Sequence, residues 1–167
     1  MLTSTKAGGN IGPAIISALH AANFTISVLS RENSTSAFPS YVNVLKTDYS
    51  PPSLLKAFQG QDAVISAVGP MGTLEQTKMI DAAAEVGVKR FIPSEYGADR
   101  SKRCHPDFEK MQERKSQVLA HLKKKSEENT NLTWTYLASG PFLDWVSKNN
   151  LPTLDSKIVK VISKRKI

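Results

Sequence analysis

The sequence has little of what an exported or membrane-spanning protein needs. It contains one cysteine, Cys104, so no internal disulfide can form, and the first twenty residues lack the apolar run of a secretory signal. No stretch approaches the roughly 20 consecutive apolar residues of a membrane helix. We therefore expect a soluble, cytoplasmic protein that has no membrane partner, and the 167 residues suit a single domain without repeats.

Excess positive charge is present, but its pattern is not typical of nucleic-acid binding. The formal net charge is +7, and much of the excess lies at residues 123–125 and 157–166. Cations near the end of a helix stabilise its dipole, and no aromatic side chains interleave these clusters as they do where bases stack. The distribution favours a solvated surface over a nucleic-acid patch. DNA binding through the basic end stays open as an alternative, which would weaken steeply with salt.

Apolar segments of strand length alternate with longer segments of helical period along most of the chain. Strands are predicted at residues 24–30, 42–46, 63–68, 90–93 and 132–137. Helices are predicted at residues 10–22, 53–58, 73–86 and about 107–127. Asn10 is placed to cap the first helix, and Gly87 is placed to end the third. The alternation predicts an α/β fold, a Rossmann-like doubly wound parallel sheet with helices on both faces.

A glycine-rich turn lies where a first strand should meet the first helix. It comprises Gly8, Gly9, Asn10, Ile11 and Gly12. Glycines at this point let backbone N–H groups and the helix N-terminus approach a pyrophosphate, which the helix dipole stabilises. The turn therefore predicts a dinucleotide-binding site, and a glycine-rich surface turn is the plain alternative.

Two further strand ends indicate which dinucleotide would bind and where. An acidic residue at the end of the strand after the glycine turn would bond the ribose of NAD, whereas Arg31 suits a 2′-phosphate. NADP(H) is therefore the predicted cofactor. Ala67, Val68 and Gly69 end another buried strand, and at the carboxyl edge of the sheet they would leave room for the cofactor. A simple strand terminator explains them equally well.

Several of these segments resemble one known family. They are GGNIGP at residues 8–13, VLSR at 28–31, KTDYS at 46–50, QDAVISAVG at 61–69, GVKRFIPSEYG at 87–97, LTWT at 132–135 and SGPF at 139–142. In them the chain resembles the NmrA-like and isoflavone-reductase-like family of atypical short-chain dehydrogenases, particularly its fungal members. The resemblance covers roughly residues 7–155, and GVKRFIPSEYG is its most specific part. It implies a Rossmann domain, NADP(H), and reduction of small, often aromatic or phenolic molecules.

The resemblance also implies a catalytic residue. Family members use a lysine early in the long helix after a PSEFG-type loop, and Lys115 matches that place, with Lys110 as the second choice. A lysine near a nicotinamide can donate a proton or polarise a substrate oxygen if burial lowers its pKa, whereas an exposed helix lysine would do neither. The adjacent Cys104 and His105 are a poor nucleophile and base, and no ligand spacing predicts a metal site.

Both ends of the chain depart from the family pattern. Lys6 stands where the family has the first glycine of its turn, and the segment before it is short and polar. The first strand is therefore predicted to be degenerate or missing. Residues 1–155 are assigned to the NAD(P)-binding domain and residues 156–167 to a basic tail. Relatives continue into a smaller substrate-binding region, so we expect a truncated chain that lacks part of the pocket.

Two functions follow from these features. The first is an NADPH-dependent reductase of a small, aromatic or phenolic molecule, in which Lys115 assists proton transfer. The second is a non-catalytic NAD(P)-binding regulator of the NmrA type, which reports redox state to a protein partner. Replacing Lys115 distinguishes them, because only the reductase needs that side chain for substrate-dependent NADPH oxidation. The sequence leaves the substrate and the oligomeric state open.

Overall fold

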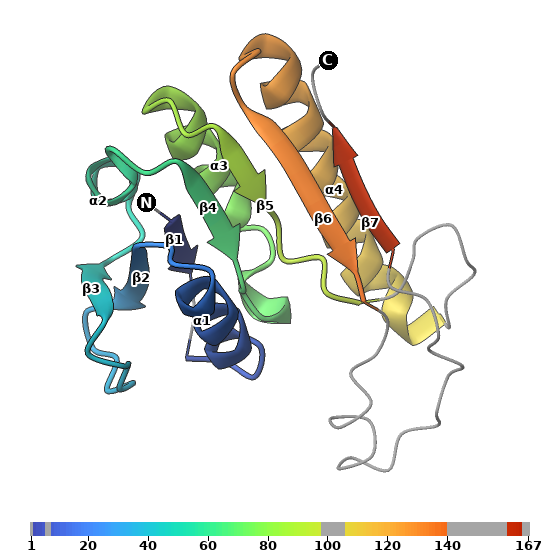
Figure 1. Ribbon diagram of the computed structural model, residues 1–167. Coiled ribbons are helices and arrows are strands. Elements are labelled where there is room, and N and C mark those ends of the chain that lie inside the picture. The colour runs from blue at the N-terminus through green and yellow to red at the C-terminus, as the bar shows by residue number, and fades with distance from the viewer. Residues whose placement is uncertain (1, 6–7, 98–105, 140–159, 165–167) are drawn as a thin grey trace.

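A computed structural model describes residues 2–5, 8–97, 106–139 and 160–164. They form a sheet in the order β3-β2-β1-β4-β5-β6-β7 (Figure 1). Its strands are β1 (Leu2–Thr5), β2 (Ile26–Arg31), β3 (Val42–Thr47), β4 (Ala63–Ser66), β5 (Arg90–Ile92), β6 (Thr133–Ala138) and β7 (Lys160–Lys164). Strands β1 to β6 run parallel, and β7 is antiparallel to β6. The first six strands have the order of a doubly wound Rossmann sheet, which confirms the predicted fold class.

Helices cover both faces of this sheet. They are α1 (Gly12–Ala21), α2 (Pro51–Phe58), the short 3₁₀ helix η1 (Pro70–Gly72), α3 (Gln76–Glu85) and α4 (Pro106–Glu128). Figure 1 shows α1 on one side of the sheet and α3 and α4 on the other. Because α1 follows β1 and crosses to β2, whereas the helices after β4 and β5 lie on the opposite side, the direction of winding reverses between β1 and β4. In open α/β sheets ligands bind at this switch point.

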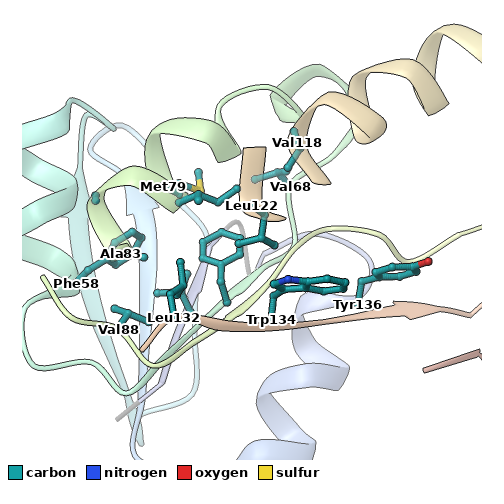
Figure 2. Packing of buried hydrophobic residues seen from close by; sticks show 14 of the residues in the cluster. Phe58, Val68, Met79, Ala83, Val88, Val118, Leu122, Leu132, Trp134 and Tyr136 are labelled. Atoms are coloured by element: carbon teal, nitrogen blue, oxygen red, sulfur yellow. The ribbon is translucent and has the colours of Figure 1, made fainter. Parts of the chain in front are cut away.

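Two apolar clusters hold the layers together. On the side of α2, α3 and α4, Phe58, Met79, Leu122 and Leu132 are among the buried side chains that pack over the sheet (Figure 2). On the other side, Ile16 of α1 packs in a smaller cluster with buried residues of β2 and β3. Each fully buried side chain of this size stabilises the fold by about 1.5–3 kcal/mol. These two clusters hold the sheet between the helices on its two faces.

The first strand, predicted to be degenerate or missing, is present as the short strand β1, so the second of these two possibilities is wrong. Residues of β1 pair in parallel register with both neighbours, so that Leu2 lies opposite Ile26 and Ala63, and Thr5 lies opposite Leu29 and Ser66. The ladder uses main-chain N–H and C=O groups, which polar residues carry as well as apolar ones. A short segment of polar composition can therefore occupy the centre of the sheet when strands on both sides supply partners.

The segment expected to be a basic tail also contains regular structure. Residues 160–164 form β7, which pairs with β6 so that Lys160 lies opposite Ala138 and Lys164 lies opposite Trp134. Sequence patterning placed no strand there. Lysine-rich composition is common at the edge of a sheet, where charge prevents pairing with other chains.

Element boundaries differ from the sequence predictions at several ends. Asn10 does not cap α1, because the N-cap position is Ile11 and no side chain bonds the helix start. Helix α2 begins at Pro51, two residues before the predicted start, since proline fits the first turn of a helix. Gly87 ends α3 as predicted, with φ of +80°, a conformation that favours glycine. No helix in the described part is long and apolar enough to cross a bilayer.

Candidate functional site

A cleft of about 880 Å³ lies at the carboxyl edge of the sheet, at the switch point between β1 and β4. Eight of the nine residues predicted to bind a cofactor line it: Gly8, Gly9, Asn10, Ile11, Arg31, Ala67, Val68 and Gly69. The ninth, Gly12, is buried as the first residue of α1 and is not among the lining residues. Segments that are far apart in the sequence are therefore brought to one cavity.

Four residues of the glycine turn, Gly8, Gly9, Asn10 and Ile11, line this cleft. Because no side chain caps α1, the first N–H groups of the helix have no side-chain partner at this end. A Cβ built on Gly8 would lie 2.8 Å from Ser36 Oγ, closer than real contacts allow. Glycine at this position therefore permits the loop after β2 to pack directly against the turn.

The loop after β2 forms a second wall that sequence reasoning missed. Asn33, Ser34, Thr35 and Ser36 line the cleft beside Arg31, the last residue of β2. The only sequence signal was the run of serines and threonines after Arg31, which reads as an ordinary polar loop. This loop contacts the glycine turn where Ser36 meets Gly8, which lies 28 positions earlier in the chain. Such a contact depends on tertiary packing and has no local sequence signal.

A smaller cleft of about 630 Å³ adjoins the first and shares Arg31, Asn33, Tyr49 and Val68 with it. Asp48, at its wall, accepts hydrogen bonds from Ser50 Oγ at 2.7 Å and from Ser50 N–H at 2.9 Å. These bonds lower the pKa of the Asp48 carboxyl, because they stabilise its charged form. The two adjoining clefts together lie along the ends of β2, β3 and β4.

The loop after β5 closes the cleft on the side of β5. Ser94 and Tyr96 line it, and Ser94 Oγ donates a 2.8 Å hydrogen bond to the carbonyl of Val68. Burial raises the pKa of the Tyr96 phenol above its usual value, since the charged form would lose solvation. A phenol is protonated at neutral pH even at its usual pKa, and burial extends this further into the alkaline range, so Tyr96 is a hydrogen-bond donor at the cleft.

Lys115, the predicted catalytic residue, lies next to this loop. Its Nζ is 3.4 Å from the position that a Cβ on Gly97 would take, and the side chain is half-buried on α4. Lys115 is not among the residues that line the cleft. The structure thus brings it to the end of the loop that carries Ser94 and Tyr96, without placing it in the cavity wall.

The structure does not describe three other candidates that the sequence offered. Cys104 and His105 lie outside the described residues, as does the side chain of Lys110. Within the described part of the chain, no group of three or more His, Cys, Asp or Glu side chains is arranged to hold a metal ion.

Comparison with known proteins identifies the family. Residues 2–160 match the profile of the NmrA-like family. The chain belongs to the NmrA-like family. This confirms the resemblance found in the sequence. Oxidoreductase aprR of Aspergillus flavus is 42% identical to this NmrA-like chain over 149 residues, which are 87% of the chain and 50% of aprR.

Solved structures of the same fold agree with this assignment. An isoflavone reductase superimposes with a TM-score of 0.74 at 26% identity, over 92% of this NmrA-like chain and 55% of the reductase. AtPrR2 with NADP⁺ and (+)pinoresinol superimposes with a TM-score of 0.78 at 24% identity, over 90% of the chain and 53% of AtPrR2. The second likeness shows the fold alone. The chain spans about half the length of the relatives that it matches.

Proposed function

We propose that this NmrA-like chain binds NADP(H) in the 880 Å³ cleft and is the cofactor-binding part of a reductase of small molecules. The observation that carries the proposal is the convergence of three segments on one cavity: the glycine turn, Arg31 at the end of β2, and residues 67–69 after β4. Rossmann sheets bind dinucleotides at this place. The names of relatives, an oxidoreductase and reductases, support the same function.

The residues of the cleft fit the cofactor. The uncapped start of α1 presents N–H groups suited to a pyrophosphate, and the exposed Arg31 is suited to a 2′-phosphate. A Cβ built on Gly69 meets nothing within 4 Å, so the end of β4 leaves open space. The volume of the cleft also lies within the range of about 300–1,000 Å³ that small-molecule and cofactor sites occupy.

Bound NADPH supplies a hydride to a substrate. In this proposal Lys115 supplies the proton at Nζ, and Tyr96, which stays protonated at neutral pH, donates a hydrogen bond toward the reacting oxygen. The substrate class is a small aromatic or phenolic molecule, such as the pinoresinol that is present with AtPrR2. The half-buried setting of Lys115 beside Gly97 supports its role.

A thermal-shift titration tests cofactor binding. A ligand that binds only the folded state stabilises it by about 2.7 kcal/mol at one hundred times its Kd, so the melting temperature should rise with NADPH. NADH should produce a smaller rise at equal concentration. If neither nucleotide changes the melting temperature at millimolar concentration, the proposal fails.

A second candidate, the redox-sensing regulator, is favoured by one observation. Lys115 does not line the cleft, as a proton donor to bound substrate would be expected to do. The discriminating assay follows NADPH oxidation with pinoresinol and with an isoflavone. Loss of oxidation in Lys115→Ala, with NADPH binding retained, establishes the reductase, and Lys124→Ala on the exposed face of α4 is the control. Tight NADPH binding without oxidation of any probe favours the regulator.

A further inference from the structure

Lys46 holds the loop after β2 in its shape without lining the cleft. It lies on β3, opposite Ser30 of β2 in the sheet register. Its Nζ donates a 2.8 Å hydrogen bond to the carbonyl of Ser34 and a 3.3 Å hydrogen bond to the carbonyl of Arg31. One ammonium group therefore fastens both ends of the turn that begins at Arg31.

The turn is closed by its own bonds as well. The N–H of Ser34 donates to the carbonyl of Arg31 at 3.0 Å, and the N–H of Ser36 donates to Ser34 Oγ at 3.3 Å. Ser34 Oγ in turn donates to Ser36 Oγ at 3.2 Å. Beyond these bonds, Ser36 Oγ packs against Gly8, so the turn is fixed between β3 on one side and the glycine turn on the other.

This arrangement separates donors from acceptors. The carbonyls of Arg31 and Ser34 accept from Lys46, which is not among the residues that line the cleft, whereas Arg31, Ser34, Thr35 and Ser36 are among them. A carbonyl directed into the cleft would repel an anion. The Arg31 guanidinium and the hydroxyls of Thr35 and Ser36 instead offer the donors that a phosphate monoester takes, since its oxygens are strong acceptors with a charge of about −1.5 to −2, while the Ser34 hydroxyl donates to Ser36 Oγ.

We propose that Lys46 is a positioning residue that sets the preference of this site for NADP(H) over NAD(H). It keeps the residues of the Arg31–Ser36 turn directed toward the 2′-phosphate, the one group that distinguishes the two cofactors, and its own charge adds to the positive potential there. The inference rests on the proposed function. In the proposed function Arg31 contacts the phosphate directly. Lys46 is a second residue for the same preference, and it acts through the main-chain carbonyls that it holds.

Paired binding measurements test the role of Lys46. Dissociation constants for NADPH and NADH, and for 2′,5′-ADP and 5′-ADP as fragments, are measured by calorimetry on the wild type, Lys46→Met and Lys46→Arg. Lys46→Met should weaken NADPH and 2′,5′-ADP roughly tenfold, the size expected when a charge-assisted contact is lost, and leave NADH and 5′-ADP unchanged. Lys46→Arg, which retains charge and donors, should recover most of the affinity.

Lys89→Met is the matched control. Lys89 bonds Asp62 at 3.2 Å near the amino edge of the sheet, so the substitution removes one positive charge without touching the cleft. It should leave the ratio of NADPH to NADH affinity unchanged. An equal loss for both cofactors in Lys46→Met, or no loss, overturns the role of Lys46. Failure of the wild type to bind either dinucleotide overturns the proposed function instead.

Discussion

The main-chain N–H of Ser94 donates a 2.8 Å hydrogen bond to Oε1 of Gln76, a side chain with no exposed surface. Gln76 Nε2 donates to the carbonyl of Thr73 at 3.0 Å, and Ser94 Oγ donates to the carbonyl of Val68. These bonds join the segment after β4 to the loop after β5. Both segments line the cleft, whereas Gln76 does not. The buried Gln76 side-chain amide therefore holds two parts of the cleft wall in position from behind.

Gln76→Leu should therefore weaken both the fold and the site. It leaves the Ser94 N–H without its acceptor, which costs about 1–3 kcal/mol, whereas the Thr73 carbonyl loses one donor and keeps the main-chain N–H of residue 76 at 3.3 Å. Urea unfolding measures the loss. NADPH affinity should fall in the same variant. Asn129→Leu is the control, because Asn129 Nδ2 bonds the carbonyl of Ala84 at the amino edge. It should lower stability and spare NADPH affinity, and parallel loss in both variants would contradict the role of Gln76.

Gly8→Ala should displace the loop after β2. The added methyl would meet Ser36 Oγ at 2.8 Å, so Ser36 must shift, at a cost of about 1 kcal/mol in the free energy of unfolding, and the NADPH Kd should rise. Gly69→Ala provides the comparison, since its methyl meets nothing within 4 Å of the protein. That variant should keep its stability and yet bind NADPH less tightly, because its methyl occupies the cleft. Equal stability of Gly8→Ala and wild type would show that the loop does not pack on the turn.

Ser50→Ala should raise the pKa of Asp48 toward its ordinary value, because the hydroxyl that donates at 2.7 Å is removed. A carboxyl whose pKa is lowered in the folded state contributes stability above its unfolded pKa, and the contribution is lost as pH falls through the folded pKa. Above the unfolded pKa of Asp48, the variant should therefore have a smaller free energy of unfolding than the wild type. In acid, where the carboxyl is protonated, the two free energies should be equal. Carboxyl chemical shifts followed by NMR between pH 2 and 6 measure the change. Ser17→Ala on the exposed side of α1 should leave this titration unaltered.

Asp81 joins α3 to α4 through two partners. His121 Nε2 lies 2.8 Å and Lys125 Nζ 3.3 Å from Asp81 Oδ1, and the hydrogen bond with Asp81 raises the pKa of Lys125. Asp81→Asn should lower stability by about 0.5–1 kcal/mol, less in high salt, since the groups are partly exposed. The Lys125 contribution is complete below its unfolded pKa and is lost as pH rises through the folded pKa. Asp81→Asn should bind NADPH as tightly as the wild type does. A change in NADPH affinity would contradict a purely structural role for Asp81.

Local patterns in the sequence were sufficient to predict the order of the helices and strands from α1 to β6, apart from η1, and the location of the cleft. Neighbouring residues are enough to recognise a glycine turn between a strand and a helix, and the residue that ends the next strand. Residues 8–11, Arg31 and residues 67–69 reach one cavity because parallel strands end at one edge. The location of the cleft therefore follows from the order and direction of the strands, without knowledge of side-chain packing.

The parts that could not be predicted depend on partners distant in sequence. The centre of the sheet accepts β1 because β2 and β4 pair with it, and β7 forms because β6 offers an edge. The wall formed by Ser34 and Ser36 depends on the bond from Lys46, 12 positions after Ser34, and on close approach to Gly8. The placement of Lys115 next to Gly97, outside the cleft wall, likewise follows from how α4 packs.

Amide chemical shifts, followed by two-dimensional NMR as NADPH is added, test the central claim most directly. The largest changes should occur at residues 8–11, 31, 33–36 and 67–69, which line the cleft. Amides near Asn129 and Lys89, at the opposite edge of the sheet, should stay unchanged. Absence of any change, or changes confined to other parts of the chain, would contradict an NADP(H) site at the switch point between β1 and β4.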